Sequence, residues 1–321
     1  MTAPSASANS IAFLFPGQGS QAVGMGEELA EKYPVARETL LEADHALGYC
    51  LSQTCFEGPE ERLRLTEITQ PAILAVSVAV ARILRANGFE PAFVAGHSLG
   101  EYSAHVTART MDFRDALRVV RNRGQYMQEA VPVGVGAMAA ILGMNGEAVG
   151  AVCSEAAQGE VCEVANFNSP EQIVISGHTA AIERAASLAT ARGAKKAKIL
   201  PVSAPFHCSL MRPAQDRLAA DLGSLTLRQP AVPVVSNVDA AVLADAEGGR
   251  DALIRQVTGS VKWEQSIRLL IARGVRTFVE VGPGRVLWGL MRQIDKSQTA
   301  LYVGDAASLE KALEHFATVS P

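Results

Sequence analysis

The sequence predicts an α/β protein: an α/β-hydrolase-like large subdomain with a mainly parallel sheet, plus an inserted ferredoxin-like (βαββαβ) small subdomain. Three observations lead to this expectation. An apolar strand runs directly into a Gly-x-Ser-x-Gly turn at residues 96–100. The segment 136–202 reads as strand, helix, strand, strand, helix, strand. From residue 232 onward, strands and helices alternate again. We therefore expect a large subdomain of residues 11–133 and 203–321, a small subdomain of residues 134–202, and a disordered tail of residues 1–10.

Composition excludes several classes of protein. The 321 residues are 48% hydrophobic and 19% charged, which is enough apolar material for a large core. A net charge of −4 gives no overall basic field, so neither nucleic acid nor a membrane surface is an expected partner. The five cysteines include no C-x-x-C pair, which favours reduced thiols in the cytoplasm over disulfides or a metal site. We expect no export signal and no segment that spans a bilayer.

The first third of the chain reads as two strands separated by helices. Residues 11–15 form an apolar run that ends in Pro-Gly-Gln-Gly-Ser-Gln, typical of a buried strand followed by a turn rich in backbone donors. This turn lacks the glycine spacing and the lysine of a phosphate-binding loop. Gln70 and Pro71 open a long apolar helix, which we expect over residues 72–87. A helix near residues 25–32 and a strand over residues 92–95 complete the pattern.

Ser98 lies where the second strand meets the helix that follows it. A serine at such a sharp turn projects above the sheet, and Gly96 and Gly100 allow the neighbouring backbone to pack closely. The positive end of the following helix places amide groups where charge develops on an attacked carbonyl. The motif also occurs by chance, but the order strand, turn, helix favours Ser98 as a nucleophile.

An arginine interrupts the apolar face of the next helix, which we expect over residues 112–130. Arg123 falls on the same face as Ala116 and Met127. Such an arginine can extend its head group to water or pair with a buried carboxylate. It can equally line a cleft and hold a substrate carboxylate through two hydrogen bonds. The residues alone leave both interpretations open.

The inserted segment contributes one candidate binding residue and one basic cluster. Asn166, which we expect at the end of a strand, can donate a hydrogen bond to substrate, although turn-forming asparagines are equally common in such places. An acidic carrier could dock on the basic cluster, although most such clusters are only solvated surface. The cluster consists of Arg192, Lys195, Lys196 and Lys198.

His207 is the histidine best placed to act as a base. It lies on a proline-containing loop after a strand and follows Ser98 in the chain order of hydrolases. A single loop histidine is more often merely part of the fold. Hydrolase order also places a carboxylate between the two residues, yet no aspartate occurs between Asp115 and Asp216. We therefore expect a neutral acceptor to orient His207, which makes it a milder base than in a complete triad.

The last third of the chain returns to alternating strands and helices. A strand over residues 277–281 leads into a Gly-Pro-Gly turn and a helix, and the alternation predicts a sheet covered on both faces. The remaining expected elements are a strand over 232–236, helices over 250–258 and 263–273, and a closing strand and helix within 300–317.

Four motifs together resemble the malonyl-CoA:acyl-carrier-protein transacylase family. They are residues 16–21, residues 96–101, Arg123-Gly124 with Met127 and Gln128, and residues 204–207, and the resemblance covers nearly the whole chain. It implies that Ser98 accepts the malonyl group and that His207 is the general base and acid. It also implies that Arg123 binds the malonyl carboxylate.

The resemblance extends to further site residues. It implies that the amides of Gln18 and Leu99 hold the oxyanion and that the backbone around Gln256 orients His207. In related polyketide acyltransferases a phenylalanine before the histidine accompanies malonyl over methylmalonyl, and Phe206 matches that pattern. Gly259-Ser260 departs from the relatives, which often have proline there. The other implied pocket residues are Gln70, Asn166 and His97.

The implied reaction is ping-pong transfer of malonyl from malonyl-CoA to the phosphopantetheine thiol of acyl carrier protein, for fatty-acid chain elongation. No cofactor and no metal are implied. Three alternatives stay open: a discrete polyketide or malonate-decarboxylase acyltransferase, a serine esterase or thioesterase, and a catalytically silent carrier-docking or scaffold protein.

Overall fold

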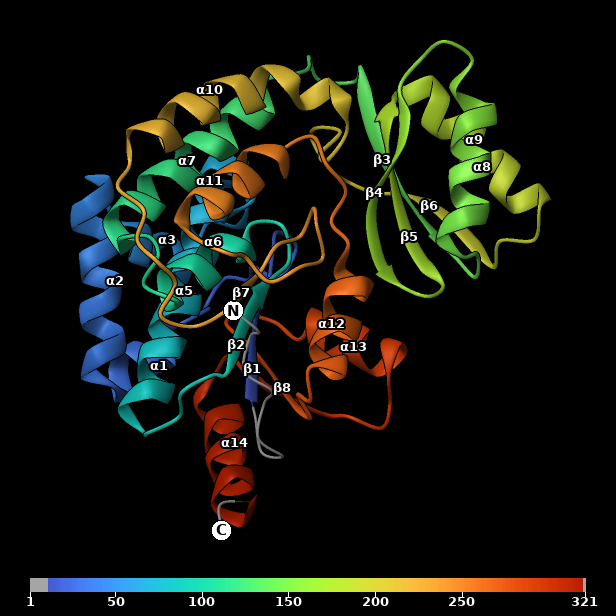
Figure 1. Cartoon of the computed structure of the whole chain (residues 1–321). Helices are drawn as coiled ribbons and strands as arrows, with labels where there is room; N and C mark the ends of the chain where they lie inside the picture. Colours follow the sequence, from blue (N-terminus) through green and yellow to red (C-terminus); the bar gives the residue numbers. More distant parts are fainter. Residues whose placement is uncertain (1–10, 320–321) are drawn as a thin grey trace.

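The computed structural model describes residues 11–319, so the expected tail of residues 1–10 lies outside it. Figure 1 shows the predicted arrangement of a large and a small subdomain. Five parallel strands form the large sheet in the order β7-β2-β1-β8-β9. These strands are β1 (Ile11–Phe15), β2 (Phe93–Gly96), β7 (Val234–Val235), β8 (Thr277–Val281) and β9 (Thr299–Val303).

Helices cover both faces of the large sheet because side chains of its central strand alternate between two cores. Phe13 and Phe15 of β1 face a core built with α5, whereas Ala12 and Leu14 face a second core built with α12 and α13. The helices outside the small subdomain are α1 (Glu27–Lys32), α2 (Pro34–Leu47), α3 (Leu51–Glu57), α4 (Glu60–Leu63), α5 (Thr66–Ala86), α6 (Gly100–Thr107), α7 (Phe113–Glu129), α10 (Arg212–Ser224), α11 (Ala246–Arg255), α12 (Trp263–Ala272), α13 (Val286–Ile294) and α14 (Ala306–Val319), with a 3₁₀ turn at Ser209–Met211.

The prediction for α5 was wrong about where the helix begins. The helix begins at Thr66 rather than residue 72, with Pro71 inside it. Packing against α2 and α7 buries most of its side chains, and the free energy gained by this burial exceeds the cost of the backbone hydrogen bond that proline removes. By length and composition α5 could cross a membrane, but 89% of its most apolar window is buried inside the protein, as in a core helix.

Helix α11 also differs from the prediction. It begins at Ala246 because the Asp245 side chain accepts a hydrogen bond from the Gly248 amide, so the two expected loop glycines lie inside the helix. A Cβ at Gly249 would lie 2.9 Å from a ring carbon of His105, and glycine therefore permits close packing on α6. The helix ends at Arg255, directly before Gln256.

The small subdomain has the predicted ferredoxin-like order. Its antiparallel sheet runs β4-β5-β3-β6, with α8 and α9 packed on one face. Met138 and Val174 on the opposite face belong to the core shared with the large subdomain. The elements are β3 (Gly136–Leu142), α8 (Gly146–Ala157), β4 (Cys162–Ser169), β5 (Gln172–His178), α9 (Thr179–Ala191) and β6 (Lys196–Ile199). The exact subdomain boundaries stay a prediction.

The placement of Asn166 at a strand end was wrong. It lies within β4, which continues to Ser169, and the pairing of β4 with β5 shifts register between Val164 and Asn166. Asn166 also forms a parallel bridge with Val261 of the large subdomain. This second pairing accounts for strand structure where the sequence indicated a turn.

Candidate active site

The turn between β2 and α6 holds Ser98 in a strained conformation. Its φ of 52° lies in the left-handed region, which non-glycine residues seldom occupy outside functional turns. A Cβ at Gly96 would lie 1.9 Å from the Gly100 carbonyl carbon, and one at Gly100 would lie 2.0 Å from the Phe15 oxygen. The two glycines therefore permit the close packing that we expected, and Ser98 projects from the carboxyl edge of the sheet.

His207 lies directly against the serine. Its Nε2 is 2.7 Å from Ser98 Oγ, and its Nδ1 is 2.9 Å from the Gln256 carbonyl oxygen. Because a carbonyl only accepts, Nδ1 carries the proton and Nε2 is free to accept from the serine hydroxyl. Burial and the nearby positive charge of Arg123 lower the pKa of His207 to about 3, so the imidazole is neutral before reaction.

The Arg123 guanidinium is buried beside these two residues. Nη1 donates to Gln70 Oε1 and Nη2 to Gln256 Oε1, each at 2.8 Å, while Nη2 also lies 3.2 Å from Ser98 Oγ. Only 2% of Arg123 is exposed, so it does not extend to water. Among residues 11–319, no carboxylate lies within 4.0 Å of it. A buried cation held by neutral amides is a ready binding site for a substrate carboxylate.

Two residues that the sequence reasoning did not select support this arrangement. Asn237 Oδ1 accepts from the Ser98 amide at 2.7 Å, and its Nδ2 donates to the Gly96 carbonyl at 2.6 Å. Glu101 accepts from Gln256 Nε2 at 2.7 Å. The position of Asn237 directly after a strand was an available signal. Glu101 belongs to the nucleophile motif itself, whereas the carboxylate of a hydrolase triad is expected later in the chain.

The other predicted residues are distributed around this centre. The ring of His97 lies 5.5 Å from that of Trp263, and its Nε2 is 2.8 Å from the side-chain oxygen of Asn168, not Asn166. Burial lowers the pKa of His97. Phe206 is 9% exposed.

The two amides expected to bind the oxyanion follow neighbouring strands. Gln18 lies in the turn after β1 and Leu99 at the start of α6 after β2, and these strands pair in parallel. Within the described part of the chain neither amide donates a hydrogen bond, which leaves both available.

The predicted basic cluster is partly neutralised. Arg192 pairs with Glu155 at 2.5 Å and Lys195 with Glu171 at 2.7 Å. Lys196 and Lys198 are exposed on β6, on the edge of the small sheet.

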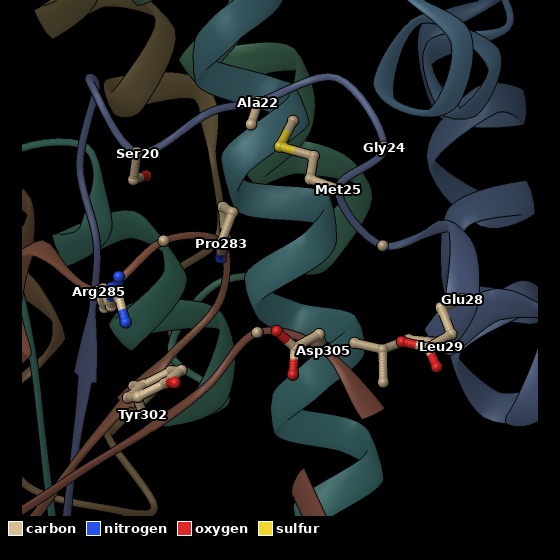
Figure 2. A pocket seen from close by; sticks show the side chains of 13 residues that line it. Ser20, Ala22, Gly24, Met25, Glu28, Leu29, Pro283, Arg285, Tyr302 and Asp305 are labelled. Atoms are coloured by element: carbon tan, nitrogen blue, oxygen red, sulfur yellow. The ribbon is translucent and has the colours of Figure 1, made fainter. Parts of the chain in front are cut away.

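A separate cavity of about 380 Å³ lies beyond the glycine-rich turn (Figure 2). It is lined by the segment from Ser20 to Leu29, by the loop that follows β8, including Arg285, and by the end of β9 with the loop after it, including Tyr302. Neither Ser98 nor His207 lines it. Residues 11–319 contain no group of three or more His, Cys, Asp or Glu side chains placed to hold a metal ion.

A serine in a strained elbow, a neutral histidine and two free amides on an α/β sheet define an enzyme class that forms a covalent acyl-serine intermediate. The sequence model of the acyl transferase domain family matches residues 12–314 of this chain. The chain belongs to this acyl transferase family, and curated relatives that are 47–50% identical to it are malonyl CoA-acyl carrier protein transacylases.

Three relatives illustrate the similarity. The malonyl CoA-acyl carrier protein transacylase of Escherichia coli K12 is 50% identical over 305 residues, covering 95% of this chain and 99% of the relative. The crystal structure of an acyl carrier protein S-malonyltransferase from Vibrio cholerae has a TM-score of 0.93 and 49% identity, covering 95% and 100% of the two chains. A malonyl-transacylase solved with its type II PKS acyl-carrier protein has a TM-score of 0.94 and 47% identity, covering 96% and 100%.

Proposed function

We propose that this enzyme transfers the malonyl group of malonyl-CoA to the phosphopantetheine thiol of acyl carrier protein through a malonyl-Ser98 ester. The observation that carries the proposal is the buried Arg123 guanidinium, which lies beside the nucleophile and has no carboxylate partner of its own. One methylene separates the two carboxyl carbons of malonate. An acyl group attached to Ser98 therefore keeps its free carboxylate close to this cation.

Acylation begins with a proton transfer. Ser98 Oγ attacks the thioester carbonyl carbon while its proton passes to His207 Nε2. The oxyanion of the tetrahedral intermediate accepts hydrogen bonds from the Gln18 and Leu99 amides. Collapse of the intermediate breaks the carbon–sulfur bond, and the imidazolium returns the proton to the departing thiolate of coenzyme A.

The carrier thiol reverses these steps. His207 takes the thiol proton, the thiolate attacks the ester carbonyl, and Ser98 leaves with the proton. Exchange of one thioester for another is nearly thermoneutral, so the enzyme must chiefly prevent water from attacking the ester. Burial of His207 and its orientation by a neutral carbonyl both keep it a mild base towards water.

Substrate binding also makes His207 a stronger base. The charge of Arg123 is one cause of the lowered pKa of His207. A bound malonyl carboxylate neutralises that charge and raises the pKa of His207, but burial is the larger cause of the lowered pKa and still holds it below its ordinary value, so His207 stays a mild base in the acyl-enzyme. The enzyme thus activates its base when the correct acyl group is in place.

The remaining roles follow from position. Gln70 and Gln256 hold Arg123. We assign His97, Asn166 and Phe206 to the substrate pocket on the family resemblance. An acidic carrier docks near Lys196 and Lys198, whose charges are exposed, rather than on the paired Arg192 and Lys195. No cofactor takes part. We place the reaction in fatty-acid chain elongation and in the cytoplasm, in keeping with five cysteines without disulfides.

The partition of the acyl-enzyme tests this function. The enzyme is acylated with malonyl-CoA, separated from free substrate, and divided between buffer and holo acyl carrier protein. The proposal predicts rapid transfer to the carrier and slow release of malonate in buffer. Equal release of malonate with and without carrier would instead identify an esterase or thioesterase.

A further inference from the structure

The acyl-transfer steps use no carboxylate of the enzyme, yet one is buried beneath the catalytic residues. Glu101 is the second residue of α6, one helical turn after Ser98, and its side chain is fully buried. Removing a carboxylate from water is costly unless it accepts hydrogen bonds. Burial raises the pKa of Glu101 to about 7, although hydrogen bonds from its neighbours and the charge of Arg123 oppose this effect. Its contacts therefore need a functional explanation.

A single oxygen of Glu101 makes both of its contacts. Oε2 accepts from Gln256 Nε2 at 2.7 Å and from the Asn237 amide at 3.1 Å. Within the described residues, Oε1 has no hydrogen-bond partner. The carboxylate thus connects two residues that lie far from it in the chain and that both contact the catalytic centre.

The first connection fixes Gln256. Its Nε2 donates to Glu101 and to the Ser98 carbonyl, and its Oε1 accepts from Arg123. These partners select one orientation of the carboxamide, because a flipped group would direct its oxygen at two acceptors and its NH₂ at a guanidinium. Without Glu101, the Ser98 carbonyl is the only one of the two acceptors left to hold the NH₂ group of Gln256 in this orientation.

The same residue orients the base. Gln256 is the C-cap residue that directly follows α11, so its carbonyl has no partner within the helix and accepts from His207 Nδ1. A side chain anchored by Glu101 and Arg123 keeps this carbonyl in place. Glu101 therefore acts on His207 and on Arg123 through one intermediate residue.

The second connection fixes the nucleophile turn. Asn237, whose amide donates to Glu101, spans the Gly96 carbonyl and the Ser98 amide with its side chain. Those hydrogen bonds hold Ser98 in its strained conformation, with a φ of 52°. Loss of the carboxylate releases one of the anchors of this clamp.

We propose that Glu101 is a positioning residue that sets the geometry of the base and of the carboxylate-binding arginine through Gln256, and of the nucleophile turn through Asn237. Acting through Gln256, it orients His207 as the carboxylate of a complete triad would do by direct contact. The proposal rests on the acyl transfer proposed above.

The test is a double-mutant cycle on the single-turnover acylation of Ser98 by malonyl-CoA, with acetyl-CoA in parallel. Glu101→Ala and Gln256→Ala each lower the acylation rate on the order of 100-fold, as misplacement of catalytic groups does. The combined variant is slower than either single variant by less than about tenfold, because both changes break one connection. Glu101→Gln keeps an acceptor and stays within about fivefold of the native enzyme. Malonyl transfer falls more than acetyl transfer in Glu101→Ala, because only malonyl needs Arg123.

Glu280 supplies the matched control. It is equally buried, burial also raises its pKa to about 7, and it accepts a backbone hydrogen bond at the start of α13, from a segment that contributes none of the catalytic residues. Glu280→Ala lowers the melting temperature but leaves the acylation rate of the folded fraction unchanged.

Two outcomes overturn the inference. The first is a purely multiplicative loss in the Glu101→Ala/Gln256→Ala variant, and the second is a Glu101→Ala enzyme that loses stability but acylates at the native rate, as Glu280→Ala does. Failure of the native enzyme itself to form a malonyl-Ser98 ester would instead refute the proposed function, so the two failures are distinguishable.

Discussion

Replacing Arg123 with alanine tests the assignment of substrate class. The substitution removes the only buried cation within reach of Ser98 Oγ among the described residues, so a bound malonyl carboxylate would have no partner. It also removes one cause of the lowered pKa of His207. We therefore expect opposite effects on acyl groups with and without a free carboxylate.

The magnitude follows from the contacts. A guanidinium holding a carboxylate in a buried site makes two charge-assisted hydrogen bonds, and truncating one member of such a pair costs about 4 kcal/mol. This corresponds to a loss on the order of 1,000-fold in kcat/KM for malonyl-CoA. Acetyl-CoA lacks the carboxylate, so its kcat/KM is expected to rise, by roughly tenfold, because the unpaired charge beside the serine is gone.

The assay compares initial acylation rates with malonyl-CoA and acetyl-CoA for the native enzyme and three variants. Arg123→Met resembles the stem of arginine and guards against a folding failure of Arg123→Ala. Arg123→Lys keeps the charge but loses the two-pronged geometry, and it should lie between the native and alanine enzymes. Parallel losses for both substrates, or unchanged malonyl kinetics, would refute the reasoning.

Three further predictions concern residues around the site. His105 is fully buried, neither ring nitrogen has a partner within the described residues, and burial lowers its pKa to about 4. As the pH falls, the histidine of the unfolded chain is protonated before the buried His105 of the folded chain, so its contribution to the free energy of unfolding is fully present above about pH 6.5 and is lost as the pH falls towards 4. Between pH 7.5 and 5, the free energy of unfolding in urea should fall by about 2 kcal/mol more for the native enzyme than for His105→Leu. Equal losses in the two proteins would contradict this. Asn237→Ala should slow Ser98 acylation by malonyl-CoA and acetyl-CoA equally, on the order of 100-fold, because both need the same turn; a loss confined to malonyl would point to Arg123 instead. Lys196→Glu/Lys198→Glu should raise the KM for the carrier about tenfold without changing acylation by malonyl-CoA. Arg192→Glu should raise this KM less, because the native side chain already pairs with Glu155. An equal rise in KM for both variants would mean that the exposed lysines have no special role, and would remove β6 from the docking surface.

The nucleophile turn was predictable from sequence because its constraints are local. Gly96 and Gly100 lie within two residues of Ser98 and determine how closely the backbone packs. The anomaly of Arg123 was also visible, since a charge on an apolar helix face needs an explanation. Neither feature depends on knowing which distant segments meet.

The supporting contacts were not predictable because they join distant parts of the chain. Glu101 and Gln256 are 155 positions apart, and Ser98 and Asn237 are 139 apart. Only the parallel pairing of β2 with β7 brings Asn237 to the nucleophile. Asn166 shows the same limit, since its pairing with a strand neighbour and with Val261 overrode its local turn preference.

The most direct test of the central claim is the mass of the protein after brief exposure to malonyl-CoA without carrier. We predict one malonyl group per chain, located on the peptide that contains Ser98, absent from Ser98→Ala and lost when holo acyl carrier protein is added. No adduct on the native enzyme, or an adduct that remains when the carrier is added, would contradict it.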